Sequence, residues 1–275
     1  MLAYVRLYTP ATKSRIRNLL LDYLRPFGIE FSLDYLLQCL DELIKNGLKA
    51  NYKYCLIREN IETALTHEGR DQQISKIIQN RAEFNAHAHL YGDLDGTSKI
   101  VRTALSQEGK LIRIRMLATA ERRFMNEAEI DQLRSARELI RLRKLTRKYG
   151  VKVHIRFEVF GDSLEIEVIN DAPILDADLK RIHEKRRKFS ELREAGDELM
   201  FFTELIDESE SGAGLGYATI DAALRNLNQN PMSALNILSV KNTAITLSLN
   251  LKALSGGSLP ATCQVIAGHT LTEAL

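Results

Sequence analysis

The sequence predicts an α/β protein, in which amphipathic helices pack against a sheet of mainly antiparallel strands. Alternation of apolar and polar residues predicts strands at 151–159, 164–168 and 242–251. Apolar residues at helical spacing predict helices at 12–24, 32–50 and 217–227. The third observation is the length of 275 residues, which is enough to bury a sizeable core.

The composition is that of an ordinary globular protein. Hydrophobic residues make up 45% of the chain and charged residues 27%, which excludes wholesale disorder. The formal net charge of +2 gives no reason to expect a nucleic-acid or membrane partner, so any basic patch must be local. No apolar run reaches the roughly 18 residues of a membrane span, and no membrane partner is expected.

The cysteines bear on the cellular compartment. Three widely spaced cysteines without a CxxC pair argue against a disulfide framework and against a thiolate zinc site. We therefore expect a protein of the reducing cytoplasm.

The first element is predicted to be a short strand. Residues 2–8 alternate loosely and end before Pro10, which lacks a backbone donor. A helix should follow over 12–24, until Pro26 and Gly28 end it.

The next helix, SLDYLLQCLDELIKNGLKA, carries the first candidate site residues. We expect Ser32 to cap it. One face is apolar, and a second stripe at spacings of three and four holds Cys39, Glu42, Asn46 and Lys49. A carboxylate, an amide and an ammonium group thus line one surface.

Residues 58–150 are predicted to be mainly helical and basic. Between Val101 and Tyr149 there are 13 basic and 6 acidic side chains. A solvated helix face is one interpretation of this surplus, and binding of an acidic partner is the other. His87 and His89 lack a third metal ligand nearby, so we interpret them as structural rather than as metal-binding or phosphoacceptor residues.

Three further features follow the predicted hairpin, whose turn is Gly161-Asp162. Its second strand runs directly into Asn170-Asp171-Ala172-Pro173, and residues 176–211 are so charged that we expect a mobile surface segment. A glycine loop, SGAGLG (211–216), then opens the helix at 217–227. Free backbone N–H groups at such a helix start can hold a phosphate.

This order of elements resembles the GHKL superfamily of ATP-binding domains, which includes gyrase, heat-shock chaperone, histidine kinase and mismatch-repair ATPases. DELIKNGLKA resembles the superfamily's N box, VINDAP its first glycine box, and GAGLG its second. Ala172 and Ile174 stand where the first glycine box has glycines. The resemblance implies a two-layer α/β sandwich of the histidine-kinase-like ATPase (Bergerat) type, with a mixed or antiparallel sheet.

The resemblance also implies a domain organisation. It covers residues 1–57 and 151–253, which would form the ATP-binding domain. Residues 58–150 would be a helical insertion, and residues 254–275 a C-terminal tail.

Through the resemblance, ATP and Mg²⁺ are the expected cofactors, and three residues of the helix at 32–50 take roles. Asn46 would coordinate Mg²⁺, Glu42 would be the water-activating or proton-accepting carboxylate, and Lys49 would approach a phosphate. An amide oxygen suits Mg²⁺, which prefers oxygen ligands. Local hydrogen bonding for Asn46 and a solvated charge for Glu42 are the simpler interpretations.

Two loops supply the remaining expected contacts. Asn170 or Asp171 would accept a hydrogen bond from adenine, although an Asx turn is the simpler interpretation. The phosphate-binding residues would be Gly212, Gly214, Leu215 and Gly216. The charged segment before them, including Phe201 and Phe202, would be the ATP lid.

Three functions remain open. The first is a signalling kinase or ATPase that phosphorylates a protein partner or hydrolyses ATP. The second is a nucleotide-gated protein-binding module with little turnover, and the third is a nucleic-acid-associated ATPase that uses the basic insertion. A homodimer is also left open.

Within the superfamily, two types of protein are the most similar. The opening strand and paired helices resemble stand-alone anti-sigma serine kinases, whereas FFTELIDESESGAGLG resembles the lid of sensor histidine kinases. No histidine precedes Glu42, where sensor histidine kinases carry their phosphoacceptor.

Overall fold

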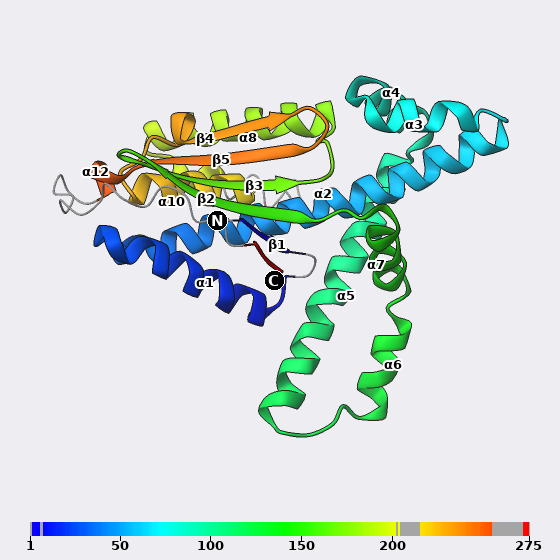
Figure 1. The fold of residues 1–275 in the computed structure, drawn as a ribbon, viewed down its shortest axis with the longest axis horizontal. Helices are drawn as coiled ribbons and strands as arrows, with labels where there is room; N and C mark the ends of the chain where they lie inside the picture. Colours follow the sequence, from blue (N-terminus) through cyan, green and yellow to red (C-terminus); the bar gives the residue numbers. More distant parts are fainter. Residues whose placement is uncertain (1, 6–7, 202, 204–214, 255–271, 275) are drawn as a thin grey trace. The chain divides into compact units, whose positions relative to one another are not determined.

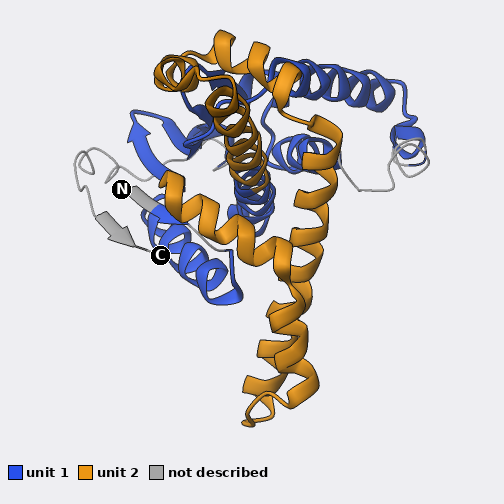
Figure 2. Cartoon of the chain, turned by 90° about the vertical axis from the view of Figure 1, so that its right-hand side faces the viewer, with its two compact units in different colours: residues 1–48, 152–275 blue, residues 49–151 orange. Residues whose placement is uncertain are grey.

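The structure is a computed structural model that describes residues 2–5, 8–201, 203, 215–254 and 272–274. Its internal contacts divide the chain into two compact units, Met1–Leu48 with Lys152–Leu275, and Lys49–Val151 (Figure 2). The sequence placed the corresponding boundaries at residues 57 and 151. The first boundary differs because helix α2 (Leu33–His67) continues without a break across it.

The first unit contains one sheet with the strand order β4-β5-β3-β2-β1-β6 (Figure 1). Neighbouring strands are antiparallel except for β6, which pairs in parallel with β1. The strands are β1 (Leu2–Val5), β2 (Val153–Phe160), β3 (Ser163–Asn170), β4 (Leu235–Ser239), β5 (Thr243–Asn250) and β6 (Thr272–Ala274). Sequence patterns predicted β1, β2, β3 and β5 but not the short strands β4 and β6.

The first unit contains helices near the three predicted ranges, 12–24, 32–50 and 217–227, and further helices that sequence patterns did not predict. Besides the start of α2, they are α1 (Pro10–Leu24), α8 (Asp176–Glu194), α10 (Leu215–Asn226), α11 (Pro231–Ala234) and α12 (Leu251–Leu254). Two 3-10 turns, η1 (Arg25–Phe27) and η2 (Glu30–Ser32), connect α1 to α2. Helix α1 begins at Pro10, two residues before the predicted start, because Thr9 accepts a hydrogen bond from the backbone of Thr12 and Pro10 occupies the first turn.

One face of the sheet carries the hydrophobic core. Strand β3 buries alternate residues and so places Leu164, Ile166 and Val168 on this face. They belong to one cluster with residues of α1, α2 and α10, among them Leu20 and Leu40. The opposite face is polar and includes the cross-strand ion pair of Arg156 with Glu167 at 2.9 Å. This is an α/β arrangement compatible with a two-layer sandwich.

Two expectations about the start of α2 are wrong. The Ser32 hydroxyl donates to the carbonyl of Ile29 at 2.6 Å within η2, so it does not cap α2. Cys39 is fully buried, with its Sγ 3.9 Å from the carbonyl oxygen of Ile220, so it does not share the polar stripe of Glu42.

The charged segment after β3 begins as an ordered helix rather than as a mobile segment. Helix α8 buries Arg186 and Phe189, although most of its residues are polar. The Phe189 ring packs edge-on against Phe201, with the ring centroids 5.0 Å apart. Residues 202 and 204–214, which include the end of the expected lid, lie outside the described residues.

The second unit is helical. It contains the end of α2 with α3 (Asp71–Gln79), α4 (Arg81–Tyr91), α5 (Leu94–Ala120), α6 (Glu127–Ser135) and α7 (Arg137–Tyr149). Helix α7 ends at Gly150, whose φ of 70° is the left-handed conformation that glycine favours. Among the described helices, none combines the length and the apolar character needed to cross a membrane.

Replacing Glu62 with glutamine is expected to reduce the acid sensitivity of the second unit. The Glu62 carboxylate accepts hydrogen bonds from Arg58 and Tyr149, each at 2.8 Å. Burial raises the pKa of Glu62, but these hydrogen bonds outweigh burial, and its pKa lies below the ordinary value. The stabilisation is therefore present above pH of about 4.3 and is lost as the pH falls through the folded-state pKa.

Thermal unfolding followed at pH 7 and at acidic pH measures this effect. The difference in melting temperature between the parent and Glu62→Gln should be largest at pH 7 and should vanish in acid. Asp131→Asn is the control, because the Asp131 side chain is 72% exposed beside Arg134 and should change neither value. An equal difference at both pH values would contradict the prediction.

Candidate functional site

Helix α2 brings two of the predicted site residues against the start of α10. Glu42 and Asn46 lie about one turn apart on α2. A methyl group on Gly216 would lie 2.9 Å from Oε2 of Glu42 and 3.3 Å from Nδ2 of Asn46. The backbone of the glycine loop's last residue therefore directly faces the carboxylate and the amide.

The same turn of α2 also approaches the end of β3. A methyl group on Gly47 would lie 3.1 Å from Cγ2 of Val153 and 3.5 Å from Cβ of Asn170. Neighbouring residues of one helix turn thus meet the start of α10 and the end of β3. Sequence reasoning missed Gly47, although a glycine within a helix is a signal of close packing.

Two acidic residues lie side by side in α2, but they have different surroundings. Asp41 accepts hydrogen bonds from Tyr8 and Lys13. Burial raises the pKa of Tyr8 and the bond to Asp41 raises it further, so the phenol stays a proton donor at neutral pH. Glu42 is 27% exposed in its side chain, with Oε1 3.0 Å from Nζ of Lys45 and Oε2 toward Gly216. Glu42 is therefore the carboxylate that faces the glycine loop.

Asn170 stabilises the turn that follows β3. Its side chain is buried, and its Nδ2 donates to the carbonyl oxygen of Ala172 at 2.8 Å. The hydroxyl of Thr243 donates to the same oxygen at 2.9 Å. These bonds hold the local turn, but they are not the Asx turn of the simpler interpretation, in which the side-chain oxygen accepts from a backbone N–H.

Asp171 points toward the start of β2. Its carboxylate accepts a hydrogen bond from the backbone N–H of Lys152 at 2.9 Å and lies 3.1 Å from Nε2 of His154. Sequence reasoning missed His154, whose signal was its place among the polar positions of the strand. Both candidates for adenine recognition therefore already have partners within the protein. Asn170 contacts Ala172, and Asp171 contacts both Lys152 and His154.

The remaining predicted residues are placed less fully. Leu215 and Gly216 form the first turn of α10, whereas Gly212 and Gly214 lie outside the described residues. Lys49 follows Asn46 by three residues on α2 and is the first residue of the second unit. His87 has its Nδ1 2.8 Å from the carbonyl oxygen of Glu83, one turn earlier in the same helix. Within the described residues no three His, Cys, Asp or Glu side chains form a metal-binding group.

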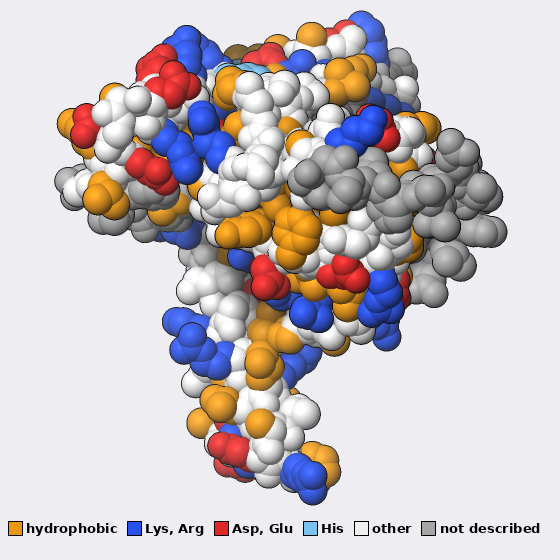
Figure 3. Space-filling view, turned by 90° about the vertical axis from the view of Figure 1, so that its left-hand side faces the viewer, with side chains coloured by type: hydrophobic (Ala, Val, Ile, Leu, Met, Phe, Trp, Pro, Cys, Tyr) orange, Lys and Arg blue, Asp and Glu red, His pale blue; other side chains and the backbone are white. Residues whose placement is uncertain are grey.

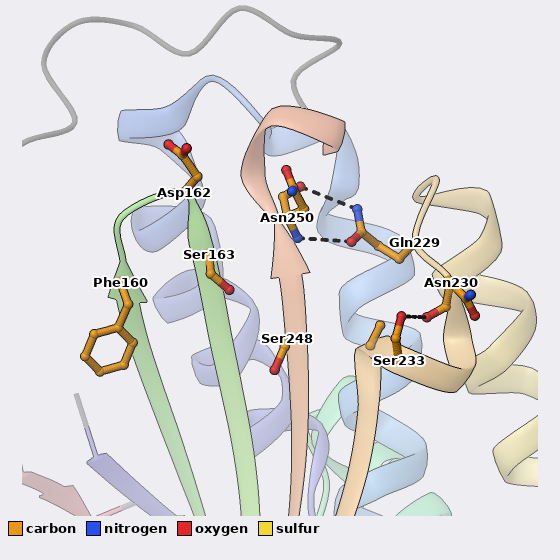
Figure 4. Close-up of a pocket in the computed structure, with 9 residues that line it drawn as sticks. Phe160, Asp162, Ser163, Gln229, Asn230, Ser233, Ser248 and Asn250 are labelled. Atoms are coloured by element: carbon orange, nitrogen blue, oxygen red, sulfur yellow. Dashed lines mark hydrogen bonds between the residues drawn. The ribbon is translucent and has the colours of Figure 1, made fainter.

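A polar pocket of about 340 Å³ lies at the opposite end of the sheet (Figure 4). Ser163, the first residue of β3, lines it, whereas Asn170 ends the same strand about 23 Å away. Two lining residues, Gln229 and Asn250, are joined by hydrogen bonds. The Gln229 side chain accepts from the backbone N–H of Asn250 at 3.0 Å and donates to the carbonyl oxygen of Asn250 at 3.4 Å. Among the predicted site residues that the structure describes, none lines this pocket.

The arrangement around α2 has a definite chemical character. The side-chain oxygens of Glu42 and Asn46 are the hard ligands that Mg²⁺ prefers, and the N-terminal backbone of α10 favours an anion. A divalent cation and a phosphate can therefore be neighbours at this place. No protein-family model, curated protein or solved structure matches the chain.

Proposed function

We propose that the first unit binds Mg·ATP in the manner of the GHKL superfamily. With this ATP it either phosphorylates a protein partner, as a kinase, or hydrolyses the ATP, as an ATPase. One observation carries the proposal, namely the close approach of Gly216 to Glu42 and Asn46. It joins two motifs that are 170 residues apart in the sequence and that the resemblance assigns to the same nucleotide. A sheet covered by helices on one face is compatible with the Bergerat type of fold.

The donor set fits a magnesium ion. Asn46 would hold the ion through its amide oxygen, and Glu42 lies close enough to hold one of its water ligands. The ion would supply charge neutralisation for the phosphates. The chain's own contribution is to position the phosphates at the first turn of α10 and to present the Glu42 carboxylate as a proton acceptor.

The surroundings favour Asn170 over Asp171 for contacting adenine. The Asp171 carboxylate already accepts from Lys152 and faces His154. The Asn170 amide uses its nitrogen to bind Ala172, and the oxygen of the same amide is an acceptor suited to the adenine amino group.

A calorimetric titration of the whole protein with ATP and Mg²⁺ tests the proposal. The parent should bind saturably, and Asn46→Ala should weaken binding about tenfold or more, because one contact to a charged ligand is lost. Removing Mg²⁺ with a chelator should lower the ATP affinity of the parent. The difference in affinity between the parent and Asn46→Ala should then become smaller.

Gln38→Ala is the matched control, since Gln38 is an exposed amide on the same helix. Its affinity should equal that of the parent. Absence of binding by the parent would overturn the proposal, and so would equal affinities of the parent and Asn46→Ala.

A second function, a nucleotide-gated binding module, is favoured by one contact. Lys45 Nζ lies 3.0 Å from Oε1 of Glu42, so this ion pair occupies one oxygen of the carboxylate that an enzyme would use as its proton acceptor. Glu42→Ala separates the two functions when phosphate release and ATP binding are both measured. Loss of turnover with binding retained supports the enzyme, whereas absence of turnover in the parent supports the module.

A further inference from the structure

Helix α5 of the second unit has one exposed face that carries positive charge and ends in apolar residues. With 3.6 residues per turn, the exposed residues of this face fall within about 120° of the helix circumference. They span about 27 Å along the helix axis at 1.5 Å per residue. The basic and apolar members of this face, which we call the α5 face, are Lys99, Arg102, Lys110, Arg113, Met116 and Leu117.

The cations of the α5 face differ from most others in the same unit. Arg143 and Lys148 of α7, for example, lie 3.0 and 3.3 Å from the carboxylates of Glu108 and Glu62. Within the part of the chain that the structure describes, the four cations of the α5 face have no acidic side chain within ion-pair distance. The single acidic residue between Lys99 and Ala120 is Glu108, which is occupied by Arg143. The positive charge of this face is therefore not neutralised within the unit.

The loop after α5 holds a phenylalanine in solvent. Phe124 is 98% exposed, and nearby Met116 and Leu117 are 52% and 50% exposed. The loop itself is ordered by Arg123, whose guanidinium bonds Glu121, Glu129 and the carbonyl oxygen of Phe124. Together, Phe124, Met116 and Leu117 expose more apolar surface at this end of the unit than one scattered residue would, and exposed apolar patches mark interaction surfaces.

We propose that the α5 face and Phe124 bind the surface of an anionic lipid bilayer. The unpaired cations would contact anionic headgroups, while Phe124, Met116 and Leu117 would enter the boundary between headgroups and acyl chains. Figure 3 shows basic and hydrophobic side chains together on the lower lobe of the surface, which is the α5–α6 end in Figure 1. The low net charge of the whole chain conceals this local surplus.

The apolar residues are the reason for a lipid surface rather than a nucleic acid. Phosphate backbones are bound by cations and polar groups, and they offer no apolar layer for three exposed apolar side chains. A bilayer interface offers both, since anionic headgroups attract cations near the surface and apolar burial adds to this attraction. This inference does not depend on ATP binding by the first unit.

Flotation of the full-length protein with vesicles tests the proposal. Vesicles of phosphatidylcholine and phosphatidylglycerol in equal parts should carry the protein upward, and vesicles of phosphatidylcholine alone should not. Arg102→Glu with Arg113→Glu should reduce the bound fraction at least tenfold, and Phe124→Ser should reduce it several-fold. All three positions are exposed, so these variants should fold like the parent.

A matched control uses the basic face of α7. Lys144→Glu with Arg147→Glu makes the same change in charge at two other exposed positions of the second unit. This variant should keep most of the binding. An equal loss of binding in the α7 and α5 variants would overturn the proposal. Binding would then depend on the net charge of the protein and not on the α5 face.

The absence of tryptophan from the chain allows a second, independent measurement. Phe124→Trp places the chain's single tryptophan at this position, and the tryptophan emission should move to shorter wavelengths on addition of the anionic vesicles. Phe160→Trp, at a 60% exposed position in β2, is the control and should show no shift. The absence of a shift for Phe124→Trp would overturn the apolar part of the proposal.

Single- and double-stranded oligonucleotides serve as competitors in the flotation experiment. Binding to oligonucleotides that the α5 variant abolishes, without binding to anionic vesicles, would overturn the proposal in favour of a nucleic-acid partner. Vesicle binding that persists in the presence of oligonucleotide and is lost in Phe124→Ser supports it.

Discussion

Asp221→Ala is expected to lower the free energy of unfolding of the first unit by about 3–5 kcal/mol. Asp221 and Arg186 are each 3% exposed, and they join α10 to α8 through hydrogen bonds of 2.9 to 3.1 Å. Removing the carboxylate would leave the Arg186 guanidinium buried without a counter-charge. The cost arises from that uncompensated charge more than from the lost contact.

Arg186 cannot easily move to water when its partner is removed. It also donates to the backbone carbonyl oxygens of Pro231 at 2.7 Å and Leu235 at 3.4 Å, and so links α8 to the start of β4. Urea unfolding followed by circular dichroism would measure the loss. A double variant, Arg186→Met with Asp221→Leu, should be more stable than Asp221→Ala, because it buries no charge.

Glu191→Ala is the control on the same helix. Glu191 lies 3.8 Å from Arg187, and the side chains of this pair are about two-thirds exposed, so its loss should change stability by less than about 1 kcal/mol. If the double variant were no more stable than Asp221→Ala, the explanation by uncompensated charge would be wrong.

The ion pair of Arg186 with Asp221 is a part of the fold that could not be predicted from the sequence. The hairpin of β2 and β3 could be predicted because period-two alternation is a local signal, and the pairing of Val153 with Asn170 follows from it. Helix α8 was mistaken for a mobile segment because most of its residues are polar. The contact of Arg186 with Asp221, 35 residues away, holds this helix in place. A local sequence pattern cannot predict such a pair.

The candidate site likewise has a part that could be predicted from local sequence and a part that could not. Spacing within one helix is enough to place Glu42 and Asn46 on one stripe, and the glycine loop is visible as a motif. Their meeting at Gly216 depends on the packing of α10 beside α2, which is tertiary. The partners of Asp171 were unpredictable for the same reason, since His154 approaches it across the β2–β3 hairpin.

Gly216→Val is expected to weaken Mg·ATP binding by at least about a hundredfold, which corresponds to about 2.8 kcal/mol. This prediction rests on the proposed function. The first carbon of the new side chain would lie 2.9 Å from Oε2 of Glu42 and 3.3 Å from Nδ2 of Asn46, so both proposed ligand groups must move. The added methyl groups would also occupy the space where the phosphates are expected.

Folding should survive this substitution, because the nearest atom is the far end of the flexible Glu42 side chain rather than backbone. Gly109→Val is the matched control, since Gly109 also lies in a helix and a methyl group there meets no atom within 4 Å. Calorimetry should give this control the affinity of the parent. In an Asn46→Ala background, Gly216→Val should weaken binding much less than in the parent, because the two changes disrupt the same contact. Full additivity of the two losses would show that Gly216 acts elsewhere than at Asn46, and the proposed junction of the two motifs would then be wrong.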